Sequence, residues 1–107
     1  MFVFNDDVKL TDLGGGVSRK ILSYNDQLMS VEVHFEKGAI GSMHTHPHVQ
    51  ISYVLKGKFE ATIGDEKKII SVGDTYITEP DVPHGVVCLE EGTLLDIFTP
   101  KRADFLK

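Results

Sequence analysis

The sequence predicts an all-β protein with a single domain. Residues 31–36 alternate between apolar side chains (Val31, Val33, Phe35) and charged or polar ones. A period of two is typical of a strand with one buried face. Glycines then recur every seven to twelve residues between Gly57 and Gly92, as in sandwiches and barrels of short strands. The length of 107 residues suits one domain and not two.

The first part of the chain is predicted to be an arm followed by strands. We expect residues 1–16 to form an N-terminal arm that ends in a loop of three glycines, residues 14–16, before the first barrel strand. No Lys-Ser/Thr pair follows these glycines, so they do not indicate a nucleotide site. The alternation of residues 31–36 resumes at residues 49–55 and 59–63.

The turns and the tail complete the predicted order of elements. Residues 56–58 and 64–65 contain glycine between apolar runs, and we expect a hairpin turn at each. No segment shows a convincing stripe of 3.6-residue period. Only residues 100–107 are expected to form a short helical turn, which docks Phe105 and Leu106.

Composition and charge exclude several classes of protein. The chain has 11 basic and 16 acidic residues and a net charge of −5, whereas nucleic-acid binding needs a basic face. A pocket for a small anion remains compatible with this charge. No apolar run approaches the roughly 18 residues of a membrane span, and the first residues lack the basic region of a signal peptide. We therefore expect a cytoplasmic protein that binds neither nucleic acid nor membrane.

The single cysteine, Cys88, rules out an internal disulfide and a Cys-based zinc cluster. We expect it to be a small buried residue between Val87 and Leu89.

Histidines supply the first chemical signal. His44, His46 and His48 lie together, and His84 follows thirty-eight residues beyond His46. Side chains two apart on a strand share a face, so His44 and His46 could bind one ion side by side, with Gln50 in the same parity. A His-x-His pair is a weak signal by itself. His84 could equally be a turn residue that caps the backbone.

The wider spacing resembles the two motifs of the cupin family. Residues 38–57 read Gly, five residues, His-x-His, three residues, Gln, six residues, Gly, as in the first motif, where Glu usually stands in place of Gln. Residues 73–85, which end in Pro83-His84-Gly85, resemble the second motif. The resemblance implies a cupin barrel, also described as a double-stranded β-helix or jelly roll. It places the ligands of one divalent transition metal ion on His44, His46, Gln50 and His84.

A glutamine ligand has a chemical consequence. Three imidazoles and an amide oxygen are neutral, so the ion would keep its full charge, which favours Lewis-acid chemistry or the anchoring of an anion over oxidative chemistry. Such a set could hold Ni, Fe, Mn, Co or Zn, and the sequence leaves the choice open.

Other candidate ligands receive a structural interpretation. A fourth imidazole, from His48, would crowd a six-coordinate ion, so we expect His48 outside the coordination sphere. We interpret His34 as a structural histidine in a strand, and Tyr53 and Tyr76 as packing residues.

Residues 13–22, 44–55 and 94–100 resemble the small single-domain cupins named for pectin degradation (KdgF-type). The run His-Pro-His-x-Gln-Ile-Ser-Tyr, at residues 46–53, is the most distinctive part of this resemblance. These proteins are linked to converting 4,5-unsaturated monouronates to linear keto-deoxyuronates, so the resemblance implies an enzyme with a small anionic sugar substrate. Carried over by position, the family's other active-site residues fall on Asp96, Phe98 and Arg102.

The residues themselves give partial support to these three positions. Asp96 shares a strand face with Leu94 and Phe98, and an inward aspartate beside a metal could transfer a proton. A surface acid at a strand end is the alternative. Arg102 offers a bidentate fork for a carboxylate, and its alternative is a solvated residue of the charged tail.

Two other functions stay open at this point. One is a mononuclear metal dioxygenase, since many cupins use that chemistry, and the other is a non-catalytic cupin that binds a sugar or metabolite. We also expect a homodimer, because residues 49–55 present apolar side chains on the face opposite Gln50 and residues 2–4 could cross to a partner.

Overall fold

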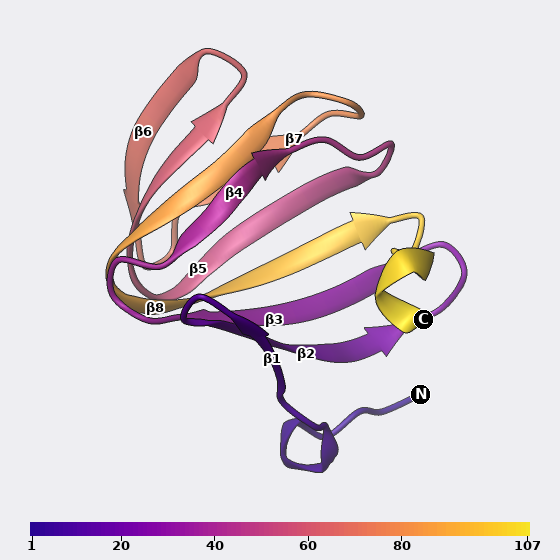
Figure 1. Ribbon diagram of the computed structural model, residues 1–107. Helices are drawn as coiled ribbons and strands as arrows, with labels where there is room; N and C mark the ends of the chain where they lie inside the picture. The colour runs from indigo at the N-terminus through magenta and orange to yellow at the C-terminus, as the bar shows by residue number, and fades with distance from the viewer.

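A computed structural model describes residues 1–107 as an antiparallel sheet of eight strands that folds over on itself into a barrel (Figure 1). The strands are β1 (Thr11–Gly14), β2 (Val17–Tyr24), β3 (Met29–Phe35), β4 (Ile40–His44), β5 (Val49–Ile63), β6 (Glu66–Ser71), β7 (Thr75–Thr78) and β8 (His84–Thr99). Two short 3-10 helices, η1 (Asn5–Asp7) and η2 (Ala103–Leu106), lie near the ends of the chain. The all-β prediction is confirmed. Neither 3-10 helix has the length or the hydropathy of a membrane-spanning helix.

The two longest strands, β5 and β8, connect the two halves of the barrel. The first half of β5 pairs with β7 and with the second half of β8. The second half of β5 pairs with β6 and with the first half of β8. β3 extends the first of these halves and β4 extends the second. The sheet bends between them, where the β5–β8 register shifts between Val54 and Phe59.

The bend explains why one predicted hairpin is wrong. Residues 56–58 lie inside β5, and Gly85 and Gly92 lie inside β8. Gly57 has a φ of 82°, and a Cβ there would lie 2.5 Å from the Glu91 carbonyl oxygen. Glycine therefore lets the two strands bend and approach closely within continuous pairing. The turn predicted at residues 64–65 is confirmed and joins β5 to β6.

The N-terminal arm also differs from the prediction. Residues 11–14 form β1, which pairs with β2, so the three glycines close a hairpin instead of leading into the first strand. At the other end, η2 confirms the predicted helical turn. Phe105 packs against the core cluster of Met29, Val31 and Phe98, but Leu106 stays 39% exposed, so its predicted docking is wrong.

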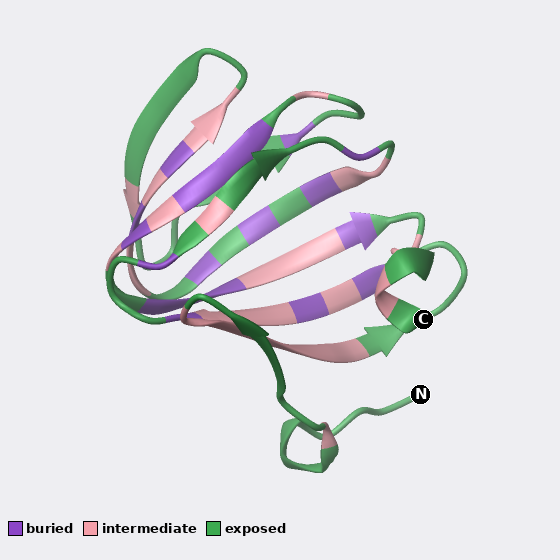
Figure 2. Ribbon diagram, in the orientation of Figure 1, coloured by how far each residue is buried: buried purple, intermediate pink, exposed green.

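Burial alternates along β5, as Figure 2 shows. Gln50, Ser52 and Val54 are buried, whereas Ile51 and Tyr53 are exposed on the outer face. Most of the interior is apolar. Four of the buried polar residues are joined to one another at a single site: His46, Gln50, Ser52 and His84.

Candidate active site

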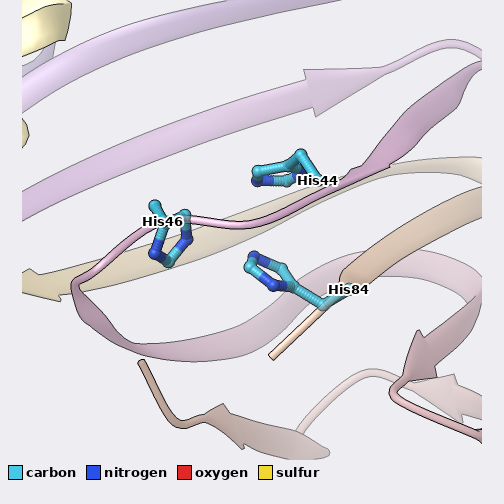
Figure 3. A group of neighbouring side chains, drawn as sticks. All are labelled: His44, His46 and His84. Atoms are coloured by element: carbon cyan, nitrogen blue, oxygen red, sulfur yellow. The ribbon is translucent and has the colours of Figure 1, made fainter. Parts of the chain in front are cut away.

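Three histidines from two segments of the chain, residues 44–46 and residue 84, point toward one another (Figure 3). His44 ends β4 and pairs across the sheet with His84, the first residue of β8. His46 lies beyond the end of β4, outside any strand. The expected reason for the pairing of His44 and His46, a shared strand face, is therefore wrong, and the loop after β4 brings His46 to the site. The three ligand atoms lie within 4.8 Å of one another.

Backbone carbonyls set the orientation of all three rings. The Nδ1 atoms of His44, His46 and His84 lie 2.7, 3.2 and 2.9 Å from the carbonyl oxygens of Ser42, His48 and Val82. When Nδ1–H donates to a carbonyl, the Nε2 of a neutral imidazole carries a lone pair. Burial lowers the pKa of His46 and His84, which favours this neutral, ligating form.

Gln50 adds an oxygen to the same point. Its Oε1 lies 2.9 Å from His46 Nε2 and 3.2 Å from His84 Nε2. Its Nε2 donates a 2.9 Å hydrogen bond to Ser52 Oγ, which fixes the direction of the amide. Lone pairs of Oε1 and of two ring nitrogens then face one another with no hydrogen between them, an arrangement that a cation relieves. The donor set thus fits a divalent metal ion.

Ser52 connects this donor set to Asp96. Ser52 Oγ donates a 2.5 Å hydrogen bond to Asp96 Oδ1 across the paired strands β5 and β8. Burial raises the pKa of Asp96 to about 6, although the hydrogen bond from Ser52 acts in the opposite direction. Asp96 therefore lies inside the barrel, as the strand alternation predicted, with a pKa suited to gaining and losing a proton near neutral pH.

A cavity of about 310 Å³ opens beside these residues. Three of the four predicted ligands line it, together with the three predicted catalytic residues: His44, Gln50, His84, Asp96, Phe98 and Arg102. A volume of this size matches small-molecule sites.

Arg102 is already paired at this cavity. Its Nε and Nη2 donate to the two carboxylate oxygens of Asp104 at 3.1 and 3.0 Å. Its guanidinium carbon lies 5.1 Å from the centre of the Phe98 ring and 4.2 Å from that of Phe105. The fork predicted for a carboxylate is thus held by a carboxylate of the chain itself.

The comparison with known proteins gives the family. The family model described as a Cupin domain matches residues 31–98. The chain belongs to the cupin family. Pectin degradation protein KdgF of Dickeya dadantii (strain 3937) is 50% identical over 107 residues, which cover 98% of this chain and 97% of that protein. This cupin therefore belongs with the KdgF proteins, as its sequence predicted.

Solved structures agree with this grouping. The structure of KdgF from Halomonas sp. is 37% identical to this cupin, with a TM-score of 0.94 over 98% of this chain and 97% of that chain. An RmlC-like cupin from Shewanella frigidimarina NCIMB 400 is 41% identical, with a TM-score of 0.95 over 97% and 94% of the two chains.

The structure also bears on the other single residues that the sequence analysis interpreted. Tyr53 is 40% exposed on the outer face, so its predicted packing role is wrong. His48 stands outside the three-histidine group, and its Nε2 donates to the Lys101 carbonyl oxygen at 3.2 Å. His34 lies 2.7 Å from Glu32, as a structural histidine would. Cys88 is 1% exposed, and Tyr76 packs against the core.

Arg19 is a cavity residue that the sequence analysis missed. It lies on β2 between Val17 and Ile21, in the same strand parity, and lines the cavity with Val17. The signal was present, because a charged residue interrupts an apolar alternation at residues 17–21.

Proposed function

We propose that this cupin converts 4,5-unsaturated monouronates to linear keto-deoxyuronates. The observation that carries the proposal is the joining of Asp96, through Ser52 and Gln50, to the convergent imidazoles at one cavity. The likeness to a pectin degradation protein over nearly the whole chain supports the substrate class.

In this proposal His44, His46, Gln50 and His84 hold one divalent ion, which is Ni, Fe, Mn, Co or Zn. The bound ion would supply positive charge that orients and polarises the oxygens of the sugar. The four ligands are neutral, and the conversion is an isomerisation that needs no oxidant.

Asp96 is the proposed proton-transfer group. The substrate is a cyclic hemiacetal whose ring oxygen is also an enol-ether oxygen. Asp96 accepts the anomeric hydroxyl proton, a C1 carbonyl forms and the bond between C1 and the ring oxygen breaks. The electron pair of the broken bond leaves an enolate at C5, which takes the proton back from Asp96 at C4 and becomes the ketone, so atoms and charge balance. The raised pKa of Asp96 supports transfer in both directions near neutral pH.

Phe98 and Arg102 form the proposed wall around the sugar. Phe98 is 3% exposed and presents an apolar surface beside His46, with ring centres 5.7 Å apart. Arg102 contributes positive charge that favours an anionic substrate. Both residues restrict how a sugar can lie against Asp96.

We also propose that the chain forms one domain over residues 1–107 and works as a cytoplasmic homodimer. The exposed apolar face of β5 and β7, which includes Ile51, Tyr53 and Ile77, supports pairing. The proposal includes residues 1–16 as an arm that could reach the partner.

The decisive test is turnover. Metal-loaded protein is incubated anaerobically with unsaturated monouronate made by a pectate or alginate lyase, and the absorbance of the enol ether is followed. We expect it to fall faster than in the unaided reaction, with a linear keto-deoxyuronate as product. A strict need for oxygen would favour a dioxygenase. Binding without accelerated loss of absorbance would favour a non-catalytic sugar-binding cupin.

A further inference from the structure

Arginine has a distinctive placement in this cupin. The chain has two arginines, Arg19 and Arg102, and both line the active-site cavity, whereas none of its lysines does. They come from opposite ends of the chain, on β2 and just before η2. Both guanidinium groups lie against the same Phe105 ring, at 3.9 and 4.2 Å from its centre.

Arg19 has donors without partners. Its Nε is buried and makes no hydrogen bond, and none of the five ion pairs of the molecule includes it. A guanidinium presents five N–H donors and remains charged at neutral pH. Leaving such a group partly buried and unpaired is costly, so an incoming anion would gain a strong interaction here.

Arg102, by contrast, already uses its donors within the protein. Its side chain is 11% exposed, and Asp104 occupies the Nε–Nη2 edge of its guanidinium. A carboxylate that enters the cavity therefore meets an occupied fork on Arg102 and an unpaired guanidinium on Arg19. Burial and charge–charge repulsion from Arg102 lower the pKa of Arg19, whereas the charge of Asp104 raises it, and a bound anion would act in the same direction as Asp104.

We propose that Arg19 binds the carboxylate of the sugar and thereby selects uronates over neutral sugars. The inference rests on the proposed function for its substrate class. Charge-assisted bidentate contact is the strongest interaction available to a carboxylate in this cavity outside the metal site. Its loss would weaken substrate binding more than it slows the chemical step, because Asp96 and the histidines stay in place.

The first experiment compares Arg19→Met and Arg19→Lys with Lys20→Met in metal-loaded protein. Lys20 is the neighbouring residue of β2, and its Nζ bonds Asn5 on the outside. We expect Arg19→Met to raise KM about 10–100-fold with kcat within about 3-fold, as loss of a charged hydrogen bond predicts. Arg19→Lys should fall between the wild type and Arg19→Met, and Lys20→Met should match the wild type. An unchanged KM in folded, metal-replete Arg19→Met overturns the proposal.

A second experiment needs no turnover, and its measurement is made on the wild type. The two arginine Nε–H signals of the ¹⁵N-labelled wild type are followed while D-galacturonate or D-galactose is added. Arg19→Lys assigns the signals. We expect galacturonate to shift the Arg19 signal strongly and galactose to leave it unchanged. A response of Arg102 alone, or of neither arginine, overturns the inference.

The two proposals can fail separately. A wild type that binds galacturonate at Arg19 but does not linearise unsaturated uronate would refute the proposed function and keep the carboxylate site. Normal turnover with no effect of galacturonate on the Arg19 signal would keep the proposed function and refute the carboxylate site.

Discussion

Gln50 joins the two chemical parts of the site. Its amide oxygen faces the imidazoles, and its amide nitrogen donates to Ser52, which in turn donates to Asp96. A glutamate here would lack the N–H that Ser52 accepts and would bring a second carboxylate close to Asp96, and like charges raise the pKa of such groups. Glutamine and serine together therefore leave Asp96 as the single carboxylate beside the donor set.

The variant Asp96→Asn tests whether Asp96 transfers the proton. The amide is nearly isosteric, so the hydrogen bond from Ser52 and the packing should persist while proton transfer is lost. We expect turnover to fall about 10²–10⁴-fold, with metal content and thermal unfolding close to those of the wild type. Turnover rates and metal content are measured on the same preparations of the variant and the wild type.

His44→Ala provides the contrast for this variant. It should lose bound metal and activity together, since it removes a ligand and leaves Asp96 intact. A metal-replete Asp96→Asn protein with wild-type rates would refute the proposed role of Asp96.

At the scale of elements, the bend of β5 and β8 depends on glycine. Gly57→Ala would place a Cβ 2.5 Å from the Glu91 carbonyl oxygen, at a φ of 82°. We expect a loss of about 2–5 kcal/mol in the free energy of unfolding, because steric overlap adds to the cost of positive φ. Urea denaturation measures the loss.

Gly14→Ala is the matched control for this substitution. Gly14 has nearly the same φ, 81°, with nothing within 4 Å of the added Cβ, so only about 1–2 kcal/mol should be lost. Equal losses in the two variants would show that close approach of the strands is not what requires Gly57.

A second prediction at this scale concerns the pH dependence of stability that comes from Asp104 in the C-terminal helix η2. Its hydrogen bonds from Arg102 lower the pKa of this carboxyl. Because the pKa of Asp104 is lower in the folded protein than its ordinary value of 3.8, the ionised carboxylate stabilises the fold. This stabilisation is fully present above pH 3.8 and is lost as the pH falls through the lower pKa of the folded state. Because Asp104 is 55% exposed, the contribution should be about 1 kcal/mol or less.

Comparing the wild type with Asp104→Asn isolates this contribution. The difference in unfolding free energy should be largest near about pH 5 and should shrink toward about pH 3. A difference that stays constant over this range would mean that the Arg102–Asp104 pair does not stabilise the fold.

At the scale of the whole molecule, the apolar outer face of the sheet predicts a homodimer. Ile51 pairs laterally with Ile77 on β7 and Ile97 on β8, so three isoleucines lie side by side, and Ile51 and Ile77 are 44% and 53% exposed. We expect light scattering at micromolar concentration to give twice the chain mass of 11.9 kDa.

Two variants test whether this face is the contact. Ile51→Glu should give a monomer, since a charge buried in an apolar interface is strongly unfavourable. Val72→Glu, in the exposed turn after β6, should leave the mass unchanged. A wild-type monomer would refute the dimer.

Local chemistry and alternation were sufficient for much of this cupin. The period of two predicted which face of each strand is buried, so Gln50 and Asp96 were expected inside before any contact was known. The resemblance to the two cupin motifs indicated one metal site at His44, His46, Gln50 and His84. Strand alternation depends on neighbours along the chain and a motif is read from the sequence directly, which is why the sequence by itself determined these properties.

The tertiary structure decided what depends on contacts between distant residues. Gly57 and Gly92 were predicted to lie in turns. Nothing in the local sequence distinguishes a turn glycine from a glycine at which two long paired strands bend and approach closely. Arg19 looked like an ordinary strand residue, and only the pairing of β2 with β3 and the docking of Phe105 bring it to the cavity beside Arg102. The Arg102–Asp104 pair likewise depends on where η2 packs. Side-chain alternation is a local property of a strand, whereas the bend and closure of the barrel result from the packing of the whole chain.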